Sequence, residues 1–207
     1  MSVLSPTKTI QTELRAITAV ASAAQDKSSE LDVSGKMSAL LFIDFGLDSA
    51  TTPVGTEFRI EASQKATGND TWRNLMSLIT GVIAPVGMVT DGVEAADQTV
   101  IECGAVVPAL GDIVFFKNAT LSLSEWGLVV ARVITGGSET VTLLDGLTNQ
   151  QAQGTYYNKA EQFLIPIDLI QTPATRLRVV CNNNYAASSA SCVWRCAAIT
   201  ADSMLGV

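Results

Sequence analysis

The residues that could support catalysis gather in the stretch TEFRIEASQKATGNDTWRNL, residues 56–75. It contains two carboxylates, Glu61 and Asp70, together with two arginines and a tryptophan. Glycoside hydrolysis uses two carboxyl groups that face each other across the sugar, about 5–9 Å apart. The stretch therefore raises a glycosidase hypothesis, in which Glu125 and Glu161 are further candidate acids.

Strand and turn patterns explain the same positions without catalysis. In TEFRIEA, the apolar residues Phe58, Ile60 and Ala62 alternate with polar ones, which is typical of a half-buried strand with Glu61 facing outward. Asp70 falls in KATGND, a turn signal. The sequence therefore favours a hairpin over an active site, and we assign no catalytic residue.

The hairpin also carries charged and aromatic side chains whose positions can be predicted. We expect Arg59, Glu61 and Arg73 to face outward, where they are candidates for contacts with a neighbouring subunit. Trp72 and Trp194 lie within strand patterns, and large aromatics in such patterns are usually buried. We therefore expect both tryptophans in the core.

The chain contains no histidine. This removes Ser-His-Asp and Cys-His nucleophilic catalysis, the usual general base near neutral pH, and most catalytic zinc or non-haem iron sites. The motifs GxSxG, GxGxxG and GxxxxGK[ST] are also absent, so the sequence contains none of these motifs for acyl transfer or nucleotide binding. We predict a protein that is not an enzyme and needs no cofactor.

Metal binding is not expected either. Asp44, Asp48 and Glu57 could be considered for calcium, but their spacing matches no EF-hand loop. The four cysteines include no CxxC pair and have no histidine to complete a zinc site.

The cysteines are Cys103, Cys181, Cys192 and Cys196. In CVWRC, period-2 alternation places Cys192 and Cys196 on one face of a strand, where free cysteine behaves as a small hydrophobe. We favour free thiols over a Cys181–Cys192 cross-strand disulfide, although sequence alone does not fix the connectivity.

A sugar-binding surface needs only exposed aromatic rings. Tyr185, in NNNYAASSAS, is the aromatic that clearly belongs to a loop. The candidates are Trp72, Trp126, Tyr156, Tyr157, Tyr185 and Trp194.

Composition limits the possible partners. Charged residues make up 16% of the 207 residues and hydrophobic ones 47%, a balance that suggests burial against neighbours as well as within the chain. The formal charge is −7 and the basic residues are scattered, so nucleic acid is a poor partner. No apolar run approaches the roughly 18 residues of a membrane helix, and we expect no targeting signal.

The pattern of elements predicts an all-β fold. From Met37 onward, about ten short apolar segments alternate with turn residues, which indicates an antiparallel β-sandwich, with a jelly roll as one candidate arrangement. Gly136-Gly137 predicts a hairpin, and Pro166 marks an edge strand or a strand start. Residues 1–36 are poor in aromatics and lack a clear period, so we expect an N-terminal arm (1–36) and a sandwich domain (37–207).

Several segments of the sequence resemble uncharacterised virion proteins of tailed bacteriophages, of the capsid decoration or cement type. They include SSELDVSGKMSALLFIDFGLD, GTEFRIEASQKATGNDTWRNL, VTLLDGLTN, KAEQFLIPIDL and TRLRVVCNNN. The resemblance implies a β-rich protein that stabilises the shell by bridging capsomers. Its expected partners are the major capsid protein and other copies of itself, as a homotrimer or homodimer.

The resemblance further implies assembly in the host cytoplasm and a final place in the virion. In this hypothesis the arm attaches the protein to shells, and deletion of Met1–Lys36 would leave a folded domain that no longer binds them. The alternatives are a tail, baseplate or head-fibre component, which could recognise a host glycan, and a carbohydrate-binding β-sandwich module.

Overall fold

The structure, a computed structural model, describes residues 11–47, 55–68, 71–80, 88–89, 92–104, 107–135, 138–154, 156–184 and 191–202. Within these ranges the chain forms 14 β-strands and one short 3₁₀ helix, and the expected all-β class is confirmed. The ten segments predicted as strands all form strands, and four further strands join them.

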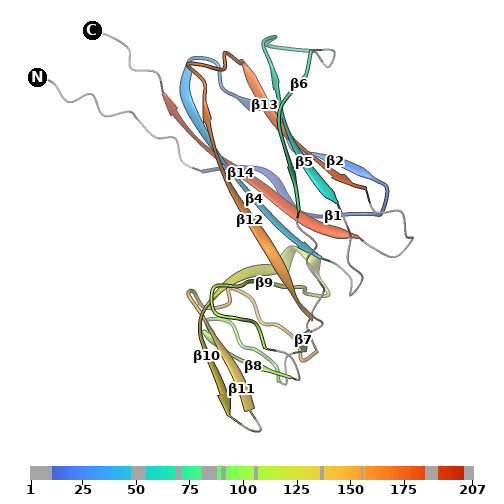
Figure 1. The fold of residues 1–207 in the computed structure, drawn as a ribbon, viewed down its shortest axis with the longest axis vertical. Coiled ribbons are helices and arrows are strands. Elements are labelled where there is room, and N and C mark those ends of the chain that lie inside the picture. The colour runs from blue at the N-terminus through green and yellow to red at the C-terminus, as the bar shows by residue number, and fades with distance from the viewer. Residues whose placement is uncertain are drawn as a thin grey trace, which may run out of the picture.

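The strands fall into a sandwich and a smaller lobe, which Figure 1 shows joined by one long strand, β12. The sandwich contains β1 (Thr12–Val20), β2 (Gln25–Lys27), β3 (Leu31–Asp32), β4 (Lys36–Leu47), β5 (Thr56–Ser63), β6 (Arg73–Ile79), β12 (Tyr156–Asp168), β13 (Arg176–Asn183) and β14 (Cys192–Asp202). The lobe contains β7 (Met88–Val89), β8 (Val100–Cys103), β9 (Ile113–Phe116), η1 (Leu121–Leu123), β10 (Glu125–Thr135) and β11 (Ser138–Leu143).

The sandwich has the connectivity of a jelly roll. Within the sandwich its first sheet has the order β1-β14-β4-β12, which continues from β12 into the lobe as β9-β10-β11-β8, and its second sheet has the order β2-β13-β5-β6. The first long strand thus pairs with the last, β2 with β13, β4 with β12 and β5 with β6, all antiparallel. An antiparallel hairpin wrapped into two sheets has this order. The predicted β-sandwich is confirmed, and among its possible arrangements this order selects the jelly roll.

Aromatic side chains fill the space between the two sheets. Phe58 of β5 is fully buried, and its ring lies 5.9 Å from Phe45 of β4 and 5.7 Å from Trp194 of β14. Edge-on and tilted contacts of this kind stabilise a core beyond the area they bury. The predicted burial of Trp194 is confirmed.

The hairpins read from the sequence are present. Strand β6 returns antiparallel to β5, and Phe58, Ile60 and Ala62 are the buried apolar residues of β5, as predicted. Strands β10 and β11 pair up to residues 135 and 138, which flank Gly136-Gly137.

Pro166 pairs in register with a residue of β4, and over this part of β12 no other described strand pairs on the opposite side. This matches the predicted edge position, where proline is tolerated.

Residues 11–36 correct the prediction of an N-terminal arm. They form β1, which pairs with β14, and β2 and β3, which pair with β13. Leu14 and Val33 are buried in the sandwich core, and Arg15 of β1 binds Asp26 of β2 through two hydrogen bonds. Because these strands supply both edges and core, they belong to the domain. Residues 1–10 lie outside the described residues.

The lobe corrects the prediction of a single sandwich over 37–207. It is inserted between β6 and β12, the fifth and sixth strands of the jelly roll, and has a core of its own, in which Val114, Phe116, Val129, Val141 and Leu143 are buried. Strand β12 belongs to both parts, because it pairs with β9 near its start and with β4 beyond. Strand spacing alone does not separate two such bodies.

One close contact holds the lobe against the sandwich. Phe115 of β9 is fully buried with Ala160 and Val193 against the outer face of the first sheet. It lies over Gly46 of β4, where a Cβ atom would come within 2.5 Å of the Phe115 ring. The absence of a side chain at Gly46 therefore lets the lobe approach.

We expect Gly46→Ala to lower the free energy of unfolding by about 1–3 kcal/mol, because the added methyl group overpacks the contact with Phe115. Urea denaturation measures the change. Gly92→Ala is the control, since its Cβ would meet only one atom, a side-chain oxygen of Glu102, at 3.9 Å. Equal stability of the two variants would show that the contact does not constrain the fold.

Deletion of residues 1–36 is expected to abolish cooperative folding, because it removes β1, β2, β3 and their core residues. Deletion of residues 1–10 removes no described strand and is expected to keep the fold. Thermal unfolding followed by circular dichroism distinguishes the two. A cooperative transition of the 37–207 fragment at the temperature of the full chain would restore the arm hypothesis.

Candidate functional site

Glu61, the first candidate acid, is held in a structural ion pair. Its carboxylate lies 2.6 Å from Arg178 and 3.7 Å from Arg59, on the outer face of the second sheet. Trp72 stacks on the same group, with its ring centre 4.1 Å from the Arg178 guanidinium and 4.9 Å from that of Arg176. The predicted outward position of Glu61 is confirmed. The prediction that Trp72 lies in the core is wrong, because cation–π stacking holds it over the outer face instead.

The other candidate acids lie elsewhere. Glu125, in the lobe, accepts hydrogen bonds from the backbone N–H groups of Thr148 (2.7 Å) and Asn149 (3.1 Å), so it anchors a loop. Glu161 lies on β12 in register with Phe45, and Asp70 lies outside the described residues. The structure does not bring Glu61 and Glu125 together as a catalytic pair would require.

The carboxylates considered for calcium are also separated. Asp44 lies on the outer face of the first sheet and forms an ion pair with Arg195 at 2.5 Å, whereas Glu57 lies on the second sheet and accepts a hydrogen bond from Asn182. Asp48 lies outside the described residues. Within the described ranges, no group of three or more His, Cys, Asp or Glu side chains could hold a metal ion.

The three tryptophans all have their rings engaged by protein groups. Trp126 packs against Phe115 with ring centres 4.7 Å apart, lies 4.7 Å from the Arg195 guanidinium, and donates a hydrogen bond to the Phe45 carbonyl. Trp194 is in the core. Tyr185 lies outside the described residues, as do the side chains of Tyr156 and Tyr157. The sugar-binding hypothesis thus gains no open tryptophan platform.

The strongest candidate site is a surface. Two rows of side chains cross the outer face of the first sheet in register, three residues in each row. We call this surface the open face and define it as Leu40, Phe42, Leu164, Pro166, Ala197 and Ile199. All six are apolar, and Leu164 is 64% exposed. The open face is therefore an apolar surface on strands whose other side already faces the sandwich core.

The open face and the surface that contacts the lobe are two halves of the same outer face of the first sheet. The lobe covers the half around Gly46 with Phe115, and the Asp44–Arg195 ion pair lies between that contact and Phe42 along β4 and β14. Strands that are apolar on both sides are typical of sheets covered on both sides. Here the lobe supplies the cover for only one half.

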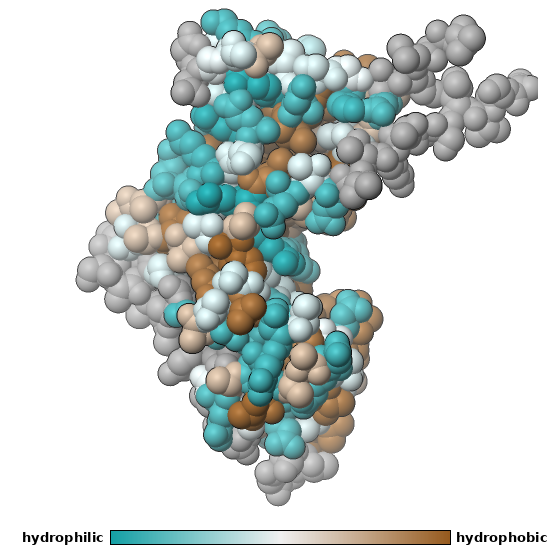
Figure 2. Space-filling view, turned by 180° about the vertical axis from the view of Figure 1, so that it is seen from behind, coloured by the Kyte–Doolittle hydropathy of each residue, from teal (hydrophilic) through white to brown (hydrophobic). Residues whose placement is uncertain are grey.

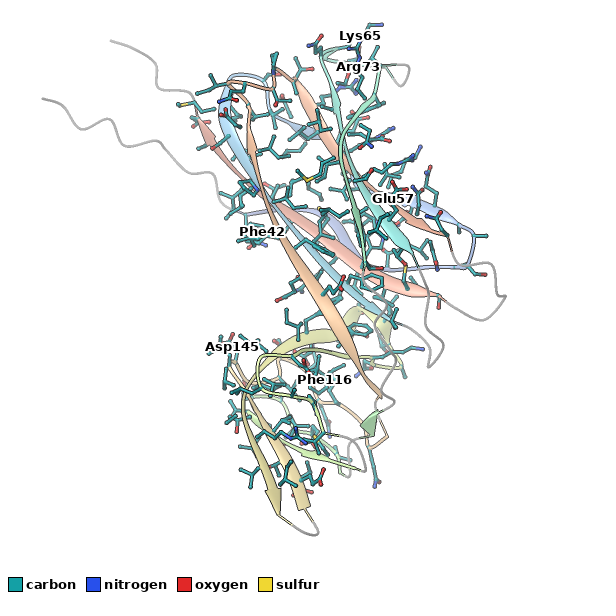
Figure 3. All side chains as sticks on the ribbon, viewed as in Figure 1. Phe42, Glu57, Lys65, Arg73, Phe116 and Asp145 are labelled. Carbon is teal, nitrogen blue, oxygen red and sulfur yellow. The ribbon has the colours of Figure 1, made fainter. Side chains whose placement is uncertain are left out.

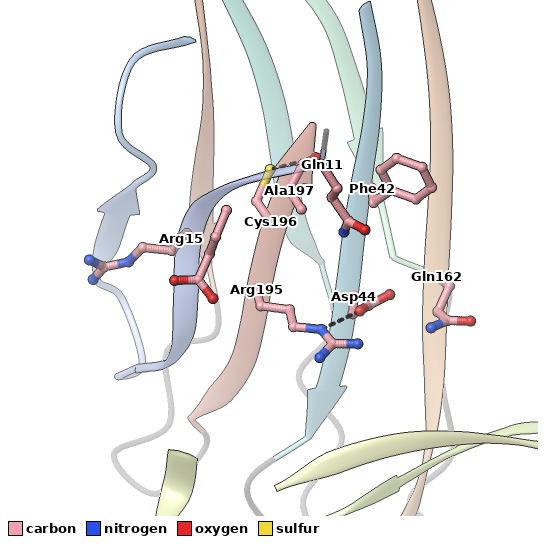
Figure 4. A pocket seen from close by; sticks show the side chains of 9 residues that line it. Gln11, Arg15, Phe42, Asp44, Gln162, Arg195, Cys196 and Ala197 are labelled. Atoms are coloured by element: carbon pink, nitrogen blue, oxygen red, sulfur yellow. Dashed lines mark hydrogen bonds and ion pairs between the residues drawn. The ribbon is translucent and has the colours of Figure 1, made fainter. Parts of the chain in front are cut away.

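Two hollows lie at the border between the open face and the lobe. One, of about 530 Å³, is lined by Phe42, Asp44, Arg195 and the start of β1 (Figure 4). A smaller one, of about 230 Å³, is bordered by Arg195 and by Asp145 of the lobe. Figure 3 shows Phe42 and Asp145 on the same side of the molecule. The border therefore combines apolar surface with charges of both signs.

The far end of the open face holds another hollow, of about 490 Å³, lined by Leu40, Pro166, Ile199 and Ile170, among others. Ile170 is 69% exposed. Figure 2 shows the molecule from behind, where hydrophobic side chains reach the surface of both the sandwich and the lobe among hydrophilic ones.

Burial raises the pKa of several groups in the described part of the chain. In the lobe, burial raises the pKa of Glu94, whose carboxylate accepts hydrogen bonds from the Glu102 N–H and from Gln98. Burial also raises the pKa of Cys103 to about 11 and that of Cys196 to about 12, so both thiols stay protonated at neutral pH. The Glu94 carboxylate therefore links segments of the lobe, and the two thiols pack as part of the hydrophobic cores.

The open face was missed by the sequence predictions, although a signal was present. MSALLFID is a continuous apolar run, and such a run predicts a strand covered on both sides.

No described helix is long and apolar enough to span a membrane.

Comparison with known proteins gives no family. No family model matches the chain, and no curated protein matches it. A solved structure described as "Structure of infectious bursal disease virus Gt strain" aligns with 95% of this chain and 40% of that chain, at 9% sequence identity and a TM-score of 0.24. The chain thus spans less than half the length of that protein, and at this TM-score the alignment carries no argument about fold or function.

We expect Glu61→Gln to lower the free energy of unfolding by about 1–3 kcal/mol, because it leaves the mostly buried Arg178 guanidinium without its charged partner. Glu57→Gln is the control, since an amide oxygen can still accept the Asn182 hydrogen bond, and its effect should stay within about 0.5 kcal/mol. Urea denaturation of both variants checks this. A Glu61→Gln variant as stable as the control would argue against a structural ion pair.

Proposed function

We propose that the protein is a non-enzymatic structural protein of a tailed-phage virion, a capsid decoration or cement protein that binds the shell and bridges capsomers. The open face carries the proposal. It is an apolar sheet surface next to hollows that hold charges of both signs, as in protein interfaces with an apolar centre and a polar rim. In this proposal the major capsid protein covers the part of the sheet that the lobe leaves bare.

The fold and composition support the same proposal. Jelly rolls occur in viral capsid, lectin and cupin domains, although a fold by itself does not set a function. A chain without histidine lacks the commonest metal ligand and general base of enzymes, and the tryptophans that a lectin would use for stacking are engaged within the protein. A non-enzymatic role in assembly fits these observations best.

The charge of the chain bears on where it would bind. A formal charge of −7 opposes contact with packaged nucleic acid and suits the outside of a shell. The edge strand β6 has exposed apolar residues, Leu75, Met76 and Ile79, and self-association as a trimer or dimer would cover such an edge.

The proposal is tested by Leu164→Glu, which places a charge in the open face. We expect this variant to bind shells of the encoding phage roughly tenfold or more weakly in co-sedimentation, because a charge would be buried in an apolar contact. Leu144→Glu is the matched control, since Leu144 is 60% exposed against 64% for Leu164 but belongs to the lobe. Equal thermal unfolding temperatures would confirm that both variants fold.

Unchanged shell binding of Leu164→Glu would rule out the open face as the contact. Immunogold labelling that locates the protein on tails would favour the tail, baseplate or head-fibre alternative. Binding to a glycan array that Leu164→Glu leaves intact would favour the carbohydrate-binding alternative.

A further inference from the structure

Two cysteines meet across the core of the sandwich. Cys181 lies on β13 of the second sheet and Cys192 on β14 of the first, and their Sγ atoms are 4.0 Å apart. Both side chains are fully buried. The two strands follow each other in the chain, so a bond between these sulfurs would join the facing sheets and close a ring of residues 181–192.

The surroundings of the pair leave few other roles for the two thiols. Cys181 lies in register with Phe58 and Cys192 with Leu47, both buried and apolar, and the part of the chain that the structure describes holds no metal-binding group. In a disulfide the two sulfur atoms are about 2.05 Å apart. The thiols therefore need to approach by about 2 Å, through rotation of the two side chains.

We propose that oxidation joins Cys181 and Cys192 in a disulfide that links the two sheets of the jelly roll. With a small-molecule disulfide as the oxidant, one cysteine thiolate attacks the oxidant to form a mixed disulfide and releases one small thiol. The second cysteine thiolate then attacks the bonded cysteine sulfur and releases the second small thiol. The protein loses two protons and two electrons, and the oxidant is reduced to two thiols.

Burial sets when this reaction occurs. Thiolates attack disulfides only where the oxidant can reach them, and both thiols are shielded in the folded sandwich. Oxidation is therefore slow in the native protein and fast when β13 and β14 separate or before they pack.

The other two cysteines provide matched controls. Cys196 lies on β14 and faces the same core, but its thiol contacts the backbone carbonyl of Ala197. Cys103 is buried in the separate core of the lobe, where its thiol contacts the carbonyl of Ile101. Each of these two buried thiols contacts a backbone carbonyl, whereas the thiols of Cys181 and Cys192 contact each other.

The experiment uses the full chain, refolded from urea with oxidised and reduced glutathione. We expect an intact mass two hydrogens below that of the reduced protein and a peptide map that links Cys181 to Cys192. The closed ring is short, so the thermal unfolding temperature should rise by about 5–10 °C relative to the protein in dithiothreitol. Cys103→Ala and Cys196→Ala should keep both the mass change and the rise, and Cys192→Ala should lose both.

A wild-type protein that retains four free thiols after refolding under oxidising conditions would overturn the proposal. So would a peptide map that links Cys192 to Cys196, or a rise in unfolding temperature that persists in Cys192→Ala. Because the map is made on the wild-type chain, the result does not depend on whether a variant folds. The inference is also independent of the proposed function, since shell binding plays no part in it.

Discussion

The contact between Phe115 and Gly46 governs how the two parts of the molecule are arranged. An aromatic ring can lie this close to a sheet only where a strand carries no side chain, and Gly46 provides that place on β4. The lobe is thereby held against the outer face of the first sheet, while β12 connects it covalently to the same sheet. Because protein interiors are close-packed, the contact between Phe115 and Gly46 leaves no space for even one added methyl group.

The open face follows from that arrangement. The lobe covers one end of the sheet, and the rows that contain Phe42 and Leu40 continue beyond it with the same apolar character. The Asp44–Arg195 ion pair and Trp126 form the boundary. A surface of this kind has more to gain from covering by a partner than from contact with water, which is why the proposed function rests on a face of the sheet and not on a cluster of catalytic groups.

The accuracy of the sequence predictions differed with the kind of signal used. Period-2 alternation located β5 and its buried residues Phe58 and Ile60, and the same reasoning placed Trp194 in the core. It failed for β1, where alanine and threonine weaken the period and partners more than 170 residues away supply the pairing. It also failed for Trp72, because two arginines of β13 create a stacking site that no local pattern reveals.

The sequence by itself determined the all-β class, the ten main strands, two hairpins and the lack of histidine chemistry, because these depend on neighbouring residues and on composition. The tertiary structure alone decided the jelly-roll order, the separate lobe, the open face and the meeting of Cys181 with Cys192. Each of these depends on how strands are arranged in space and not on the sequence within one strand. Their positions depend on which strands pair and on what covers each face, and a single chain read locally does not contain that information.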